Sequence, residues 1–148
     1  MKDLLIYKCE VCGYILEVID LGKKQLIESG TSFARTITVA DAKLICCGKP
    51  MTLVQANSVD ASNEKHVPII EFGNDTAVVK VGSISHPMTP EHFIKWITIL
   101  YGDRIQRVEL EPGDTPEASF HIGNESNVKA YAYCNLHGLW MSSASRQK

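Results

Sequence analysis

Residues 128–141, "VKAYAYCNLHGLWM", decide how the chain folds near its C-terminus. A strand-like run ends at Cys134, Asn135 and Gly138 provide turn residues, and a second apolar run follows. This pattern predicts a β-hairpin whose turn brings Cys134 and His137 together. A Cys and a His at that spacing can be a nucleophile with its base, half of a metal site, or a pair without a function.

Short apolar runs separated by turns also fill the chain before this hairpin. The turns are rich in Gly, Asp and Asn, as in "GND", "YGD", "EPGD" and "GNES". Short strands at such regular spacing predict an all-β sandwich. The expected strands cover residues 69–72, 77–84, 93–101, 106–110, 118–122, 128–134 and 139–141.

One segment also carries a helix signal. In "TPEHFIKWI", residues 89–97, Thr89 is a suitable N-cap and Pro90 suits the first helical turn. Residues 94–100, however, alternate and are rich in β-branched side chains, which favours a strand. We therefore expect at most one turn of helix there.

The first third of the chain has a different pattern. Residues 4–19 place strand-like runs around a C-x-x-C-G turn, and residues 33–39 alternate like a further strand. The polar stretch "QANSVDASN", residues 55–63, is the best candidate for a linker. The sequence therefore predicts two domains, a small head over residues 1–54 and a larger domain over residues 55–148.

Size and composition limit the function classes. The chain has 148 residues, of which 45% are hydrophobic, and this suits one medium globular domain or a small domain attached to a larger one. A net charge of −2 gives no indication of a nucleic-acid partner. No apolar run approaches the roughly 18–20 residues of a membrane span, and no signal-peptide pattern opens the sequence. We therefore expect a cytoplasmic protein without a membrane segment.

Four of the five cysteines, Cys9, Cys12, Cys46 and Cys47, lie in the first third of the chain. In a reducing cytosol such a group favours metal binding over disulfides, and four thiolates suit tetrahedral iron or zinc. The adjacent pair can reach one ion only if the chain bends there, and the "GKP" that follows predicts that bend. Because about 50 residues give a thin core, we expect the metal to stabilise the head.

Four of the five histidines lie in distinctive contexts: "EKHVP" contains His66, "SHPMTPEH" contains His86 and His92, and "CNLH" contains His137. Six residues along a strand would separate His86 from His92 by about 20 Å, and along a helix they would face different sides. Only a tight loop lets both bind one ion, and two prolines between them favour a loop. The fifth histidine and both tryptophans match no such context, so we interpret His121 as a strand-end residue and Trp96 and Trp140 as core.

Together these motifs resemble the desulfoferrodoxin family, the two-iron superoxide reductases. "YKCEVCG" and "LICCGKPM" are similar to a desulforedoxin-like, rubredoxin-like head, and "EKHVP", "SHPMTPEHFIKWI" and "YCNLHGLW" to a neelaredoxin-like domain. The resemblance covers nearly the whole chain. One departure is that the 33 residues between Cys12 and Cys46 form a longer segment than the family's head usually carries.

The resemblance implies an all-β fold in which an immunoglobulin-like β-sandwich follows the head and carries a catalytic iron. It implies that His66, His86, His92 and His137 are equatorial ligands of this iron, that Cys134 is the axial thiolate, and that the head holds a second iron or a zinc. It also implies a homodimer that reduces superoxide to hydrogen peroxide, with rubredoxin as the electron donor.

Two charged residues before His66 acquire a role only through this resemblance. Glu64 and Lys65 would border the open face of the iron, where Lys65 attracts the anionic substrate and Glu64 occupies the sixth position after oxidation. By sequence alone, "EK" is a common solvated pair.

Three other functions compete with this interpretation. A dismutase would use the same site. A non-catalytic electron-transfer or metal-storage protein would use the four cysteines of the head. A cysteine hydrolase with Cys134 as nucleophile and His137 as base would leave the other patterned histidines unexplained, and it lacks an orienting third group nearby.

Overall fold

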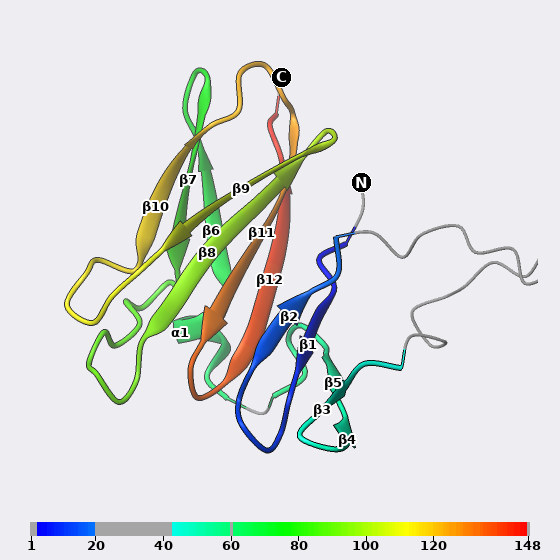
Figure 1. The fold of residues 1–148 in the computed structure, drawn as a ribbon. Coiled ribbons are helices and arrows are strands. Elements are labelled where there is room, and N and C mark those ends of the chain that lie inside the picture. The colour runs from blue at the N-terminus through cyan, green and yellow to red at the C-terminus, as the bar shows by residue number, and fades with distance from the viewer. Residues whose placement is uncertain (1–2, 20–42, 60, 148) are drawn as a thin grey trace, which may run out of the picture. The chain divides into compact units, whose positions relative to one another are not determined.

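The computed structural model describes residues 3–19, 43–59 and 61–147, and these residues are mainly β-strands (Figure 1). The described chain divides into two compact units, a small one over Asp3–Val54 and a larger one that contains Gln55–Lys148. The all-β class expected from the sequence is confirmed. The strand expected over residues 33–39 lies outside the described residues.

The small unit is built around strand β1 (Ile6–Lys8). This strand pairs antiparallel with β2 (Ile15–Glu17) on one side and with β5 (Thr52–Val54) on the other. The β1–β2 pairing confirms the hairpin expected around C-x-x-C-G. The described buried residues of this unit are Leu4, Ile6, Tyr7, Cys9 and Met51, and the last three form one cluster with a few partly buried neighbours.

A second, tighter hairpin carries the adjacent cysteines. Strands β3 (Ile45–Cys46) and β4 (Lys49–Pro50) pair across a two-residue turn. Both turn residues, Cys47 and Gly48, are left-handed, with φ of 51° and 73°. This is the backbone that a two-residue hairpin requires. The expected bend is therefore present, and it begins at Cys47 itself rather than after it.

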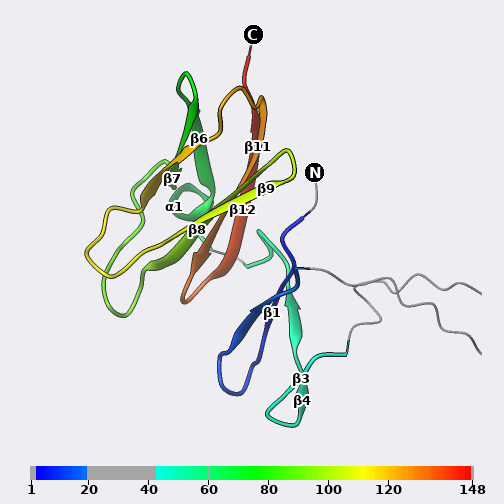
Figure 2. The same cartoon turned by 45° about the horizontal axis from the view of Figure 1, so that its top comes forward.

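The larger unit consists of two antiparallel sheets that face each other (Figures 1 and 2). One sheet has the order β10-β7-β6 and the other the order β12-β11-β8-β9. Inward-facing residues of β7, among them Ala77 and Val79, pack into one apolar core with Ile97 and Ile99 of β8 and Ala130 of β11. The strands are β6 (Pro68–Phe72), β7 (Thr76–Val81), β8 (Ile94–Tyr101), β9 (Arg104–Glu109), β10 (Glu117–His121), β11 (Asn127–Cys134) and β12 (Gly138–Ser145).

Each strand expected in this unit is present, and the differences lie at the ends. Strand β7 ends at Val81 instead of residue 84, because Gly82 takes a left-handed φ of 82° and turns the chain. Strand β12 continues past residue 141 to Ser145. Its last residues are small and polar and have little strand propensity, but they pair with β11 as far as Asn127.

The sequence does not predict the short helix α1 (Asn63–His66), because four residues are too few for a periodic pattern. Residues 89–97 form no helix. Instead, the His92 N–H donates to the Thr89 carbonyl (3.1 Å), so that Pro90 occupies the second position of a four-residue turn. No helix in the described part of the chain is long and apolar enough to cross a membrane.

Candidate metal centres

The five metal ligands expected in the larger unit come together. Their ligand atoms all lie within 4.8 Å of one another, although three separate segments supply them. Helix α1 ends at His66, the loop between β7 and β8 carries His86 and His92, and the β11–β12 hairpin carries Cys134 and His137. We call these five residues the histidine–cysteine cluster.

The four imidazole rings of this cluster form a closed square. Around the square, neighbouring ring centroids lie 4.5–4.9 Å apart and neighbouring planes meet at 77–89°. Across the diagonal, His66 and His92 are 6.0 Å apart. The order around the square is His66, His86, His92 and His137. Four rings placed in this way can direct one nitrogen each towards a common centre.

Hydrogen bonds show which nitrogen is free on two of the rings. His66 Nδ1 lies 2.7 Å from the Ser62 carbonyl, and His86 Nδ1 lies 2.6 Å from the Pro87 carbonyl. Because a carbonyl only accepts, both Nδ1 atoms carry the proton, and the Nε2 lone pairs remain available. The Nε2 atoms of His86 and His92 are buried without a hydrogen-bond partner, which is the state expected of metal ligands.

His137 contributes the other nitrogen. Its Nδ1 lies 2.9 Å from His66 Nε2 and 3.7 Å from Cys134 Sγ. Two nitrogens at right angles around an ion, each about 2.1 Å from it, would be separated by about 3.0 Å. The donor set, three Nε2 atoms, one Nδ1 and one sulfur, therefore fits a single mononuclear metal ion.

Burial sets the charge of these groups. It lowers the pKa values of His66 and His92, and that of His86 to about 4, because an imidazolium is poorly solvated there. At neutral pH these three rings are therefore uncharged and keep their lone pairs. Burial also raises the pKa of the Cys134 thiol, while the backbone N–H groups of His137 and Leu136 lower it. A bound cation would complete the conversion of this thiol to a thiolate.

The helix that ends at His66 is held by the turn after β7. The Ile84 N–H donates to the Glu64 carbonyl (3.0 Å), and the Gly82 N–H donates to Val67 (3.2 Å). A Cβ on Gly82 would lie 2.7 Å from the Glu64 carbonyl oxygen, so only glycine allows this approach. The sequence did not single out Gly82 as part of the site. The available signal of a close backbone contact was a glycine inside an apolar run.

Trp140 has a second role beside filling the core. It is completely buried, as expected, and its indole stacks on the His66 ring with centroids 4.7 Å apart and planes 24° apart. Together with the Ser62 carbonyl, this contact restricts the orientation of the His66 ring. The sequence placed Trp140 in the core but did not reveal which ligand it touches.

The two charged residues expected at the open face, Glu64 and Lys65, are exposed on α1 directly before His66. Neither belongs to the histidine–cysteine cluster.

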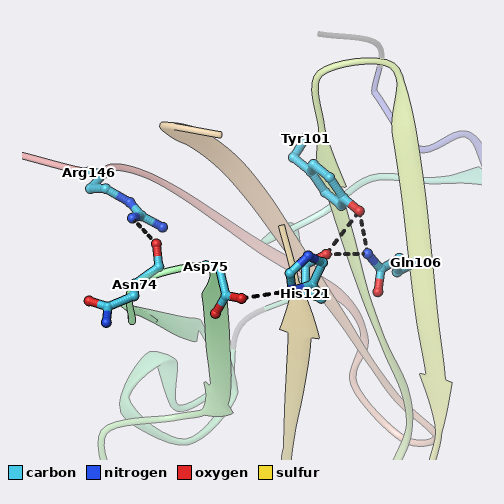
Figure 3. Close-up of polar contacts among 6 residues, drawn as sticks. All are labelled: Asn74, Asp75, Tyr101, Gln106, His121 and Arg146. Carbon is cyan, nitrogen blue, oxygen red and sulfur yellow. Dashed lines mark hydrogen bonds and ion pairs between the residues drawn. The ribbon is translucent and has the colours of Figure 1, made fainter. Parts of the chain in front are cut away.

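His121 ends strand β10 and lies outside both metal-ligand groups that the described residues form, in agreement with its interpretation as a strand-end residue. Figure 3 shows its surroundings. Its Nδ1 lies 3.3 Å from Asp75, and its carbonyl accepts hydrogen bonds from Tyr101 (3.1 Å) and Gln106 (2.8 Å). Nearby, the Arg146 side chain donates to the Asn74 carbonyl (2.5 Å). These contacts connect loops to strand ends.

The four cysteines of the small unit form a second group, which we call the cysteine cluster. Cys12 and Cys46 sulfurs are 3.6 Å apart, and Cys46 and Cys47 sulfurs are 3.9 Å apart. Tetrahedral coordination with metal–sulfur bonds of about 2.3 Å gives sulfur–sulfur distances of about 3.8 Å. The adjacent pair therefore fits one ion, as the left-handed turn at Cys47 allows.

The protonation of the cysteine cluster also indicates a cation. Backbone N–H groups of Cys12 and Val11 lower the pKa of Cys9 to about 6, whereas the Cys12 and Cys9 sulfurs raise that of Cys46 to about 12. Hydrogen bonds to these two sulfurs favour the protonated Cys46 thiol, and repulsion between thiolates adds to the effect. A metal ion removes this repulsion.

Comparisons with family models, known sequences and solved structures identify the relatives of this chain. Residues 58–143 match the family model for desulfoferrodoxin, and residues 2–30 match the model for the desulfoferrodoxin N-terminal domain. The chain is 46% identical to a desulfoferrodoxin of Syntrophotalea carbinolica, over 95% of this chain and 97% of that one. It is 39% identical to a superoxide reductase of Pyrococcus horikoshii, over 56% of this chain and 88% of that one. Among solved structures, the superoxide reductase of Treponema pallidum superimposes with a TM-score of 0.67 at 31% identity, over 95% of this chain and 99% of that one.

Proposed function

The chain belongs to the desulfoferrodoxin family, and on this premise we propose that it is a superoxide reductase. In the reaction, superoxide takes up one electron and two protons and becomes hydrogen peroxide. The observation that carries the proposal is the square of four imidazoles, two of which have buried Nε2 atoms without a hydrogen-bond partner, beside the buried Cys134 thiol.

We propose iron as the ion of the histidine–cysteine cluster. Imidazoles and one thiolate suit a redox-active transition metal, and five ligands leave one of six positions open to a substrate. When bound, iron would supply the single electron that superoxide requires, with its reactivity adjusted by the thiolate. The chain's own contribution is to keep the imidazoles of His66, His86 and His92 neutral, shield the Cys134 sulfur from water and supply backbone N–H groups to it.

Glu64 and Lys65 are proposed to act at the open position. Both are exposed and directly precede His66, so their charges lie on the segment that supplies this ligand. The Lys65 ammonium would attract an anionic substrate and stabilise developing negative charge. The Glu64 carboxylate would serve as an additional oxygen ligand between turnovers.

The cysteine cluster is proposed to hold a second iron or a zinc. Its sulfur–sulfur distances suit either metal, because both form tetrahedral thiolate sites.

We also propose that the protein is a cytoplasmic homodimer and that a rubredoxin-type protein supplies its electrons. Size-exclusion chromatography with light scattering tests the dimer, and the rate of reoxidation of reduced rubredoxin by the protein with superoxide tests the donor.

Product stoichiometry tests the activity. A reductase forms one hydrogen peroxide per superoxide and consumes a donor, whereas a dismutase forms half as much and releases dioxygen. We expect the ratio of one for the wild-type protein and a loss of superoxide consumption in Cys134→Ser. A ratio of one half would establish the dismutase instead.

The cysteine cluster makes a non-catalytic electron-transfer protein the second candidate. The matched variant Cys12→Ser separates the two functions. If superoxide consumption survives in Cys134→Ser, the assignment of catalysis to the histidine–cysteine cluster is wrong, and its loss in Cys12→Ser would identify the cysteine cluster as the redox centre.

A further inference from the structure

One side chain outside the ligand set binds both neighbours of a ligand. The Asn135 carboxamide accepts a hydrogen bond from the Phe93 N–H (2.9 Å) and donates one to the Glu91 carbonyl (2.8 Å). Phe93 and Glu91 are the residues on either side of His92. Asn135 itself directly follows Cys134.

The backbone of Asn135 strengthens this link. Strands β8 and β11 pair regularly up to Trp96 and Tyr133, and the register then shifts, so that Cys134 pairs with Ile94. Without further hydrogen bonds, the pairing of β8 with β11 would end at this irregularity, beside the ligand Cys134. The Asn135 N–H instead donates to the Phe93 carbonyl (3.1 Å), and its side chain extends the connection to Glu91.

His92 needs such an external support more than two of the other rings do. His66 and His86 each donate Nδ1–H to a carbonyl, which fixes the orientation of the ring. In the described part of the chain, the His92 ring has no carbonyl partner of this kind. The hydrogen bonds between Thr89 and His92 close the loop on itself but do not connect it to the hairpin that carries Cys134.

We propose that Asn135 is a positioning residue that fixes His92 relative to Cys134, two ligands on different segments. The inference rests on the ligand set of the proposed function and adds a residue to which the sequence assigned only a place in a turn. A side chain that orients a ligand typically contributes a factor of 10–100 to metal affinity. The proposal assigns that role to the hydrogen bonds of Asn135 with Phe93 and Glu91.

The chain contains a matched control. Asn57 makes the same set of bonds elsewhere: its carboxamide pairs with the Met141 N–H (2.8 Å) and carbonyl (3.0 Å), and its own N–H donates to Leu139 (2.9 Å). Asn57 is adjacent to no ligand in sequence. Its partners Leu139 and Met141 flank Trp140, which stacks on His66, so Asn57→Ala loosens a contact of one ligand without removing a link between two ligands.

The test compares iron-loaded full-length Asn135→Ala and Asn57→Ala with the wild type. Iron in the histidine–cysteine cluster is measured by the absorption band that is lost in Cys134→Ser, while a chelator competes for the metal. We expect Asn135→Ala to bind iron about 10–100-fold more weakly and to shift this band. Asn57→Ala is expected to lose much less affinity, because it separates no two ligands. Equal affinity and an unshifted band in Asn135→Ala, or an equal loss in Asn57→Ala, overturn the proposal.

A second measurement does not depend on iron. In the metal-free protein, the Phe93 amide should exchange with deuterium faster in Asn135→Ala than in the wild type, since its acceptor is removed. Unchanged exchange contradicts the proposal, because the carboxamide would then not hold this segment. Neither measurement uses superoxide, so failure here leaves the reductase assignment to the product stoichiometry.

Discussion

At the scale of single residues, the larger unit buries a thiol and an imidazole whose burial is explained by a bound metal ion. Cys134 is completely buried, and burial raises its pKa, so the thiol would stay protonated without a cation. Burial keeps His86 neutral, and its Nε2 has no hydrogen-bond partner. One metal ion resolves both conditions, because it binds the thiolate and the free nitrogen together.

Lys65 provides the first prediction at this scale. Lys65→Ala should slow the reaction with superoxide about tenfold at low salt, because a positive charge beside the open position is lost. Stopped-flow mixing at several salt concentrations measures the rate. Lys80→Ala removes the same charge from a lysine that pairs with Glu71 on a neighbouring strand, 2.8 Å away, and should change the rate little. Equal rates in the two variants contradict the role of Lys65.

Gly82 provides the second prediction. Gly82→Ala should destabilise the larger unit by about 3 kcal/mol, since a methyl group would press on the Glu64 carbonyl and the backbone is left-handed. Gly123→Ala has the left-handed backbone, but its methyl group would meet no atom within 4 Å, so about 1 kcal/mol is expected. Urea unfolding followed by tryptophan fluorescence reports on this unit, because it contains both tryptophans. Equal losses would show that the close approach is unimportant.

At the scale of elements, each metal centre is assembled from hairpins and loops rather than from one regular element. The β1–β2 hairpin supplies two sulfurs of the cysteine cluster, and the β3–β4 hairpin supplies the other two. Around these sulfurs, Tyr7, Cys9 and Met51 pack together with a few partly buried neighbours. Because units of about 50 residues usually need a metal or another cross-link, we expect the metal to stabilise the small unit.

This expectation leads to a prediction about metal removal. Cys12→Ser should lose the metal of the small unit, and the amides of β1, β2 and β5 should then lose their protection from hydrogen exchange. The amides of β7 and β11 should keep theirs, because they belong to a separate core. Hydrogen exchange with mass spectrometry measures both groups. Undiminished protection in β1, β2 and β5 would mean that the small unit does not need its metal.

The elements also show what the sequence allows one to predict. Alternating side chains and turn residues predict the strands of the larger unit, and the prolines around residues 87–90 predict the ligand loop. Helix α1 is too short for a periodic signal. The contacts of Gly82, Asn135 and Trp140 depend on residues far away in the sequence, so no local pattern reveals them.

At the scale of the whole molecule, residues 3–19, 43–59 and 61–147 contain two metal-ligand groups, one in each compact unit. Each group draws its ligands from within a single unit, so each can be removed by a substitution that leaves the other ligand set complete. The small unit provides only sulfur ligands, whereas the larger unit provides four nitrogens and one sulfur. The two centres should therefore give different spectra.

The most direct test of the account is metal analysis with visible and EPR spectra of anaerobically purified protein, compared with Cys134→Ser and Cys12→Ser. We expect two metal ions per chain, of which at least one is iron. Cys134→Ser should remove only the signal of the histidine–cysteine cluster, and Cys12→Ser only that of the cysteine cluster. An iron signal of the larger unit that is unchanged in Cys134→Ser would contradict the assignment of the catalytic centre.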